Sequence, residues 1–432
     1  MPGQLPLICP PGPGRFAAPE NDQWDYLLSS IWSQMLHLVV SLEGRLNHAR
    51  LMQAALLLAD SIPLLNCRFV EEPGSAWERL PAPDPGTVCP LVEDPSPGAI
   101  QQALVTRLDP AEGPQYRVTL VRGESDTLIL SVNHSACDAS GVRFIARSLC
   151  TAYRELAVNP GFTLPREDPC DRSLDPVLAR FAPGERERFF RESGGLTADW
   201  GMPFRTFTCT SPGCRWISLD QAQFRAMKTS AQEHSVTVND LLLAAFFSTL
   251  QEYIPHQPGR EYPVLTSIDL RRYLGPHAPA VANLSVAFEV RLPAGLPYSR
   301  TMGRVHAAMQ EKKDNHAGIG AAVRVVNQLS AGLPAARSEL QDLKRRSRED
   351  RYPKNPFFTN TGVIQPECAD YGDIRTTGAF LAPPVDYPPS FGLAASTFAG
   401  RLTLSTCFCR DALPAALVEE LLSRMAGLLS PP

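Results

Sequence analysis

Short apolar stretches recur along the first part of the chain with spacings that predict alternating strands and helices. Residues 37–42, 116–121 and 127–132 are runs of apolar and β-branched side chains, which is typical of buried strands, and the last two runs are close enough to form a hairpin. Residues 47–61 repeat apolar side chains at helical spacing behind Asn47, a residue type that often caps a helix. The pattern therefore predicts a sheet covered by helices.

A second set of strands and helices follows a connection rich in proline, glycine and charge, residues 166–201. We expect this connection to separate a first lobe, residues 1–165, from a second lobe, residues 202–432. Residues 339–351 carry charges of both signs and are expected to form a solvated helix face. The pattern predicts helices over residues 220–234, 241–253, 298–328 and 414–429, and strands over residues 206–219, 262–269, 286–292, 357–362, 392–396 and 401–407.

A polar break ends the run at residues 127–132 and leads into a helix. Asn133 and His134 interrupt the apolar side chains, Asp138 follows four residues after the histidine, and Gly141 opens a stretch of helical spacing. No other histidine of the eight has an acidic residue at this distance. A histidine titrates near neutral pH, and a strand end can hold it rigidly. The pattern therefore indicates a general base at His134.

The composition mainly argues against certain classes of binding partner. The chain has 432 residues, of which 44% are hydrophobic and 20% charged, and its formal net charge is -4. This length and apolar content suffice for two globular domains, and the near-neutral balance indicates neither nucleic acid nor an anionic membrane as a partner. The longest apolar run, residues 241–247, is too short to span a membrane. Residues 1–15 lack the basic and apolar regions of a secretory signal.

The 11 cysteines are spread along the chain without a CxxC pair. The closest pairs are Cys209 with Cys214 and Cys407 with Cys409, and no histidine stands near them at the spacing of a zinc finger. We therefore expect reduced thiols, a cytoplasmic location and no metal site.

Four segments resemble, in order and spacing, the motifs of one enzyme superfamily. Residues 133–141 look like the HHxxxDG signature of the condensation-domain and alcohol acetyltransferase superfamily, whose members share a fold with chloramphenicol acetyltransferase. Residues 237–245 resemble the helix that opens the core of the second lobe, residues 267–271 the strand that ends in aspartate and arginine, and residues 359–362 the strand after the long helices. Residues 37–61 fit as well, so the resemblance extends over nearly the whole chain.

The resemblance implies an α/β (α+β) fold with two chloramphenicol acetyltransferase-like lobes, each a mixed sheet flanked by helices. The active-site channel would lie between the lobes with His134 at its middle. By analogy, His134 takes the proton from an acceptor hydroxyl or amine as this group attacks a thioester, with acyl-CoA as the expected donor and no acyl-enzyme intermediate. The implied reaction needs no cofactor, and its partners are a small-molecule acyl donor and acceptor.

The same resemblance assigns roles to further residues. Asp138 is expected to pair with Arg271 and to shape the site rather than to touch the substrate. The residues expected to bind the substrate are Asn133, Gly141, Asn360 and Thr361. For the last two, hydrogen bonding within a strand end is an equal alternative to a contact with the substrate or with its tetrahedral oxyanion.

The sequence departs from the superfamily pattern at two positions of the signature. Asn133 replaces the first histidine, although an amide can still form local hydrogen bonds. Ala139 stands where a glycine is expected. Residues 370–374 only poorly imitate the DFGWG signature of plant acyltransferases, which argues against that branch. We interpret Cys137 as a packing residue and Ser135 as a turn hydroxyl rather than as nucleophiles.

Three functions are compatible with these observations. The first is an acyltransferase that moves an acyl group from acyl-CoA to an alcohol or amine. The second is a free-standing condensation enzyme that forms an amide or ester from substrates held by an acyl or peptidyl carrier protein. The third is a catalytically degenerate homologue that binds an acyl ligand or a partner. Asn133 and Ala139 favour this third function, whereas the retained His134, Asp138 and Arg271 oppose it.

Overall fold

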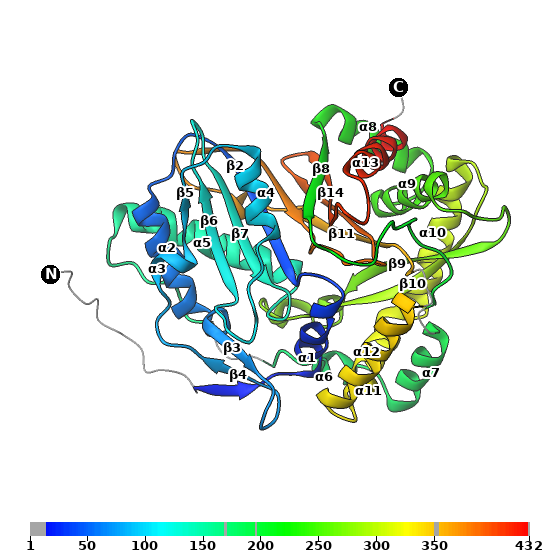
Figure 1. Cartoon of the computed structure of the whole chain (residues 1–432), viewed down its shortest axis with the longest axis horizontal. Coiled ribbons are helices and arrows are strands. Elements are labelled where there is room, and N and C mark those ends of the chain that lie inside the picture. Colours follow the sequence, from blue (N-terminus) through cyan, green and yellow to red (C-terminus); the bar gives the residue numbers. More distant parts are fainter. Residues whose placement is uncertain (1–13, 168–170, 195–196, 350–353, 431–432) are drawn as a thin grey trace.

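Two separate sheets form the centres of two lobes in this computed structural model, which describes residues 14–167, 171–194, 197–349 and 354–430 (Figure 1). One sheet is five-stranded and the other six-stranded, and a small three-stranded sheet lies beside the first. Helices flank both large sheets (Figure 1). This mixed α/β arrangement confirms the predicted fold class.

The first lobe contains a five-stranded sheet with helices on both faces. In the order of the sheet, its strands are β12 (Arg375–Ala382), β2 (Met35–Glu43), β7 (Thr127–Asn133), β6 (Tyr116–Val121) and β5 (Leu91–Val92). Its helices are α2 (His48–Ser61), α3 (Pro85–Val88), α4 (Pro97–Val105) and α5 (Ala139–Val158). Strands β6 and β7 pair antiparallel, which confirms the predicted hairpin.

Burial on both faces of this sheet explains the unbroken apolar run in β2. Leu38 and Val40 belong to the core that α2 and α5 share with the sheet, whereas Val39 packs with the side chains of α4. A strand that is covered on both sides carries apolar residues at consecutive positions. Asn47 caps α2 as predicted, because its side chain accepts a hydrogen bond from the backbone N–H of Arg50.

The second lobe contains the six-stranded mixed sheet. Its strands are, in sheet order, β10 (Ser285–Pro293), β9 (Glu261–Asp269), β11 (Phe357–Ile364), β13 (Gly392–Phe398), β14 (Arg401–Cys409) and β8 (Pro212–Leu219). Strand β11 runs parallel to β9 and β13, and the other pairs are antiparallel. The helices are α8 (Gln221–Glu233), α9 (Val238–Tyr253), α10 (Tyr298–Asp314), α11 (Ala317–Leu329), α12 (Leu333–Glu349) and α13 (Ala415–Leu429). Helix α9 is buried on nearly all sides, which accounts for its apolar sequence.

The remaining elements are short. They are β1 (Arg15–Ala17), β3 (Cys67–Val70), β4 (Ala76–Arg79), α1 (Glu20–Leu27), α6 (Asp175–Leu178), α7 (Pro183–Ser193) and the 3₁₀ turns at Leu28–Ser30, Pro63–Asn66, Leu270–Tyr273, Gly275–His277 and Pro366–Cys368. Helix α7, within the predicted connection, packs closely on α11. A Cβ atom on Gly320 of α11 would lie 2.4 Å from the carbonyl oxygen of Phe189. Within the described ranges, no helix has the length and apolar character needed to cross a membrane.

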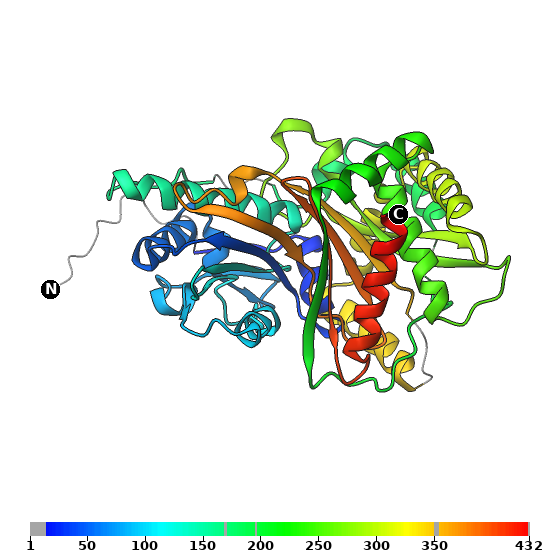
Figure 2. The ribbon, with the colours of Figure 1, turned by 90° about the horizontal axis from the view of Figure 1, so that it is seen from above.

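Two of the differences between the structure and the predicted elements change the architecture. Strand β12 was not predicted, and it crosses from the second half of the chain to pair with β2 in the first lobe (Figure 2). The lobes therefore do not divide cleanly at residues 166–201, because β12 covers an edge that β2 would otherwise expose. The helix expected over residues 298–328 is in fact two helices, α10 and α11. The chain turns between them at His316, whose φ of 48° is left-handed.

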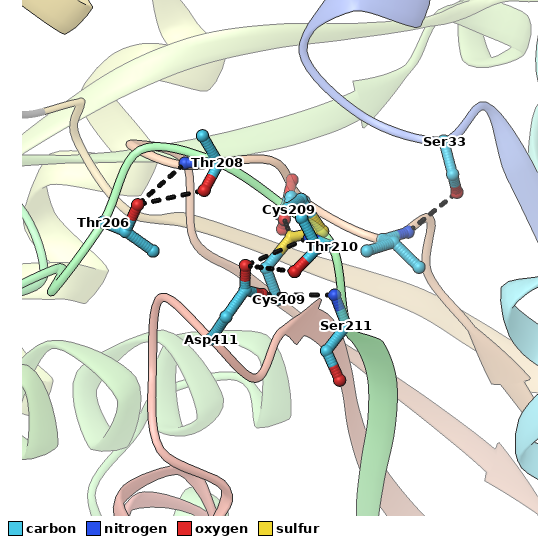
Figure 3. Close-up of a disulfide and its surroundings, with 10 residues drawn as sticks. Ser33, Thr206, Thr208, Cys209, Thr210, Ser211, Cys409 and Asp411 are labelled. Carbon is cyan, nitrogen blue, oxygen red and sulfur yellow. Dashed lines mark hydrogen bonds between the residues drawn. A yellow bond between two sulfur atoms is a disulfide. The ribbon is translucent and has the colours of Figure 1, made fainter.

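Four cysteines form two disulfides in the second lobe, which corrects the expectation of reduced thiols. Cys214 and Cys407 face each other on the adjacent strands β8 and β14, with Cα atoms 4.0 Å apart. Cys209 and Cys409 form the other bond, next to Asp411, whose carboxylate accepts hydrogen bonds from the chain before β8 (Figure 3). The paired cysteines are 193 and 200 residues apart in sequence, so only the fold brings them together.

The surroundings of the Cys209–Cys409 bond also contain a group of potential metal ligands. The two sulfur atoms and the carboxylate of Asp411 are the one such group found within the described part of the chain. Both sulfurs take part in the disulfide, so they are not available as thiolate ligands.

Candidate active site

A cavity of about 230 Å³ lies between the two lobes. His134 lines it from the first lobe, and Ser267 of β9 and Thr359 of β11 line it from the second. The hydroxyl groups of Ser267 and Thr359 share a hydrogen bond of 2.8 Å. Much of the remaining wall is apolar and includes Trp24, Leu36, Val286 and Leu393. The cavity thus combines one histidine, a few hydroxyl groups and the charged side chains of Asp25, Asp138, Arg324 and Asp386 with a largely apolar surface.

His134 follows directly after β7, and the backbone fixes its position. Its backbone N–H donates to the carbonyl oxygen of Gln34, at 2.6 Å. Its side chain is 21% exposed, and it lines the cavity. Nδ1 of the imidazole lies 3.2 Å from Oδ1 of Asn283, in the loop before β10. One ring nitrogen is therefore held by the second lobe.

The hydrogen bonds of Asn283 determine which nitrogen of His134 carries the proton. Its Nδ2 donates to the carbonyl oxygen of Ser135, at 3.1 Å, and to Oδ1 of Asp22, at 3.4 Å. This orientation leaves Oδ1 of Asn283 as an acceptor, so Nδ1 of His134 is assigned the hydrogen. In the neutral imidazole the lone pair is then at Nε2, where a general base needs it.

Asp138 and Arg271 form the pair that the sequence predicted. Nη1 of Arg271 donates to Oδ2 of Asp138 at 2.6 Å, and the carboxylate side chain is only 3% exposed. Oδ1 of Asp138 caps α5 by accepting from the backbone N–H groups of Ser140 and Gly141. Oδ2 also accepts from the N–H of Leu284, next to Asn283. The pair thus joins the start of α5 to the loop that holds His134.

Of the residues predicted to bind the substrate, only some lie in the cavity wall. Thr361 lines the cavity, and its hydroxyl group donates to the carbonyl oxygen of Ala395. Asn360 is not part of the cavity wall, and its Oδ1 accepts from the backbone N–H of Gly362. This is the strand-end interaction that was the alternative interpretation of Asn360.

Asn133 and Gly141 lie behind the cavity rather than in its wall. The Asn133 side chain is fully buried, where Nδ2 donates to the carbonyl oxygen of Leu108 and Oδ1 accepts from the N–H of Ser135. Asn133 therefore holds the turn before α5. Asn133, which replaces the first histidine of the signature, therefore has hydrogen-bond partners within the protein for both its amide oxygen and its amide nitrogen.

Gly141 is needed for close packing at the start of α5. A Cβ atom there would lie 2.5 Å from Cβ and 2.8 Å from Sγ of Cys137. We expect Gly141→Ala to reduce the free energy of unfolding by about 1–3 kcal/mol, as other overpacked cores do. Gly303→Ala in α10 is the matched control, because nothing lies within 4 Å of its Cβ position, and it should stabilise the helix by up to about 1 kcal/mol. Urea unfolding of both variants measures the difference, and equal effects would contradict the packing role.

Cys137 and Ser135 are placed as packing and turn residues. Burial raises the pKa of the Cys137 thiol well above its usual range, which disfavours the thiolate that a nucleophile needs. Neither residue lines the cavity. The predicted interpretation of both as structural residues is consistent with these positions.

Helix α1 contributes residues that the sequence did not single out. Asp22 binds Arg172 through an ion pair of 2.9 Å and accepts a hydrogen bond from Trp77. Asp25 lines the cavity, with Oδ2 4.0 Å from Nδ1 of His134, and burial raises the pKa of its carboxyl group to about 7. The signal available in the sequence was the group of acids near the N-terminus, residues 20–25, at a spacing that places them along one helix.

Solved structures match the whole fold, although no protein-family model and no curated protein sequence matches the chain. Polyketide synthase associated protein 5 from Mycobacterium tuberculosis aligns with a TM-score of 0.65 and 16% identity, over 95% of this chain and 97% of that protein. The trichothecene 15-O-acetyltransferase from Fusarium sporotrichioides aligns with a TM-score of 0.70 and 11% identity, over 96% of this chain and 95% of that enzyme. The first condensation domain of the CDA synthetase aligns with a TM-score of 0.67 and 16% identity, over 98% of both chains. The chain therefore has the two-lobed fold of the condensation-domain and acetyltransferase superfamily.

Proposed function

We propose that the protein is an acyltransferase that moves an acyl group from a thioester, with acyl-CoA as the expected donor, to an alcohol or amine. The observation that carries the proposal is the placement of His134 in the wall of the cavity between the lobes, with Nδ1 held by Asn283. That hydrogen bond fixes the tautomer with a free lone pair at Nε2, which suits a general base.

The proposed reaction passes one proton through His134. Nε2 takes the proton from the acceptor O–H or N–H group as the oxygen or nitrogen attacks the thioester carbonyl carbon. The resulting tetrahedral oxyanion collapses, the C–S bond breaks, and the leaving thiolate takes the proton from Nε2. The hydroxyl groups of Ser267, Thr359 and Thr361 line the same cavity, and one of them is a candidate donor to the oxyanion.

A condensation enzyme that uses carrier-protein substrates is the second candidate. It is favoured by the likeness to the first condensation domain of the CDA synthetase, which extends over 98% of both chains. The chemistry at His134 would be the same, and only the carrier of the thioester would differ. The third candidate, a degenerate homologue, loses its main support at Asn133, because this side chain is buried in hydrogen bonds of the turn rather than facing a ligand.

A thiol-release assay tests the proposed function. The full chain is mixed with acyl-CoA donors of increasing chain length and with a panel of alcohols and amines, and free thiol is measured. A parallel series offers the same acyl groups on carrier proteins. We expect acceptor-dependent thiol release with at least one donor, and mass spectrometry should find the ester or amide. If folded protein releases no thiol above the acceptor-free background in either series, the proposal is wrong.

A further inference from the structure

Helix α1 places a carboxylate near Nδ1 of His134, the ring nitrogen that does not take the acceptor proton in the proposed reaction. Asp25 is the last acidic residue of this helix, and its Oδ2 lies 4.0 Å from Nδ1 of His134. The Asp25 side chain is 13% exposed, and it lines the same cavity as the histidine. Asp25 approaches from the N-terminal helix, and Asn283 reaches the same nitrogen from the second lobe.

The other charged side chains near Asp25 have partners of their own. Asp22 is paired with Arg172, and Asp138 is paired with Arg271. Arg324 of α11 also lines the cavity, but its Nη2 donates to Ser193 and to the carbonyl oxygen of Gly194. On α12, Arg337 forms an ion pair with Glu71. Over the described ranges, His134 is the one basic side chain within 4.0 Å of the Asp25 carboxylate.

We propose that Asp25 is a positioning residue that stabilises the imidazolium form of His134 during acyl transfer. This inference rests on the proposed function. When Nε2 takes the acceptor proton, the ring gains a positive charge, while Nδ1 keeps its hydrogen and continues to donate it to Oδ1 of Asn283. The Asp25 carboxylate balances that charge through space, in an apolar cavity where the attraction is stronger than in water. No bond forms to Asp25, and the proton passes from Nε2 to the leaving thiolate.

The ionisation of Asp25 gives this role a pH dependence. Burial raises the pKa of the carboxyl group to about 7, and the nearby His134 opposes that rise. The carboxylate is therefore present above about pH 7 and is lost as the pH falls below it. Its contribution to the rate should follow the same direction, rising with pH through neutrality.

The closing experiment compares Asp25→Asn with Asp386→Asn. Asp386 lines the same cavity, and burial raises its pKa to about 7 as well, but it has no interaction with His134. The protonation of His134 is followed by carbon-13 NMR of histidine-labelled protein, with His134→Gln identifying the resonance. We expect Asp25→Asn to reduce the share of protonated His134 at neutral pH, whereas Asp386→Asn leaves that share unchanged. In the acyl-transfer assay, Asp25→Asn should lower kcat about tenfold with KM unchanged, because only the charged transition state loses a stabilising interaction.

The possible outcomes separate this inference from the proposed function. A shifted His134 titration together with a lower kcat supports the role of Asp25. An unshifted titration, or a wild-type kcat in Asp25→Asn, overturns it even if the wild-type protein is an active acyltransferase. An inactive wild-type protein instead overturns the proposed function. In that case the titration still decides whether Asp25 and His134 interact.

Discussion

Replacing His134 with alanine is expected to lower the rate constant for acyl transfer by about two to four orders of magnitude. Nε2 is the atom proposed to take the acceptor proton, and no other imidazole in the described part of the chain lines the cavity. The fold should survive, because the His134 side chain is 21% exposed and its removal leaves Asn283 with one unsatisfied oxygen. A lost hydrogen bond of this kind reduces stability by about 1 kcal/mol.

His234→Ala is the matched control for this variant. His234 is an exposed residue at the end of α8, and its Nδ1 contacts only the carbonyl oxygen of Ser230. Both variants are assayed by thiol release under saturating donor and acceptor, and their thermal midpoints are compared. Added imidazole should restore part of the rate in His134→Ala, because it can occupy the vacated space and accept the proton. Undiminished turnover in this variant would remove the general base from the proposed mechanism.

The sequence predicted the part of the site that lies within one continuous segment, from β7 through the turn after it to α5. The apolar run of β7, the polar residues after it and the helical spacing of α5 are local patterns, and they suffice to place His134 at a strand end. Arg271 lies 133 residues from Asp138, and only the superfamily resemblance linked the two. Local spacing alone could not have paired them, because the contact depends on how the lobes meet.

The features that the sequence did not single out as part of the site have weak local signals. Helix α1 spans 8 residues and is rich in polar and acidic side chains, so its sequence shows little of the apolar repeat that predicts a helix. The sequence pattern also does not indicate a role for the loop residue Asn283, because that role depends on contacts with Asp22 and Ser135. Strand β12 begins with polar residues and becomes apolar only where it packs between the lobes. In each case tertiary contacts, more than the neighbouring residues in the sequence, determine where these residues lie in the fold.

Arg271→Ala is expected to reduce the free energy of unfolding by about 3–5 kcal/mol, the range found when one partner of a buried ion pair is removed. Arg271 and Asp138 have side chains that are 14% and 3% exposed, so the variant leaves a buried carboxylate without its cation. It also removes hydrogen bonds from the guanidinium to the carbonyl oxygens of Pro279 and Ala282, in the loop that leads to Asn283.

Arg68→Ala supplies the control, because Arg68 pairs with Glu78 at 2.8 Å on the surface, with side chains 45% and 35% exposed. A pair this exposed contributes about 0–1 kcal/mol, so its loss should be small by comparison. Urea unfolding of the two variants gives the difference in stability, and thiol release gives the activity. Because the loop that holds Asn283 loses its anchor, we expect Arg271→Ala to lose activity together with stability. Loss of turnover at wild-type stability would instead show that Arg271 acts on the reaction itself, and the structural role of its pair with Asp138 would be wrong.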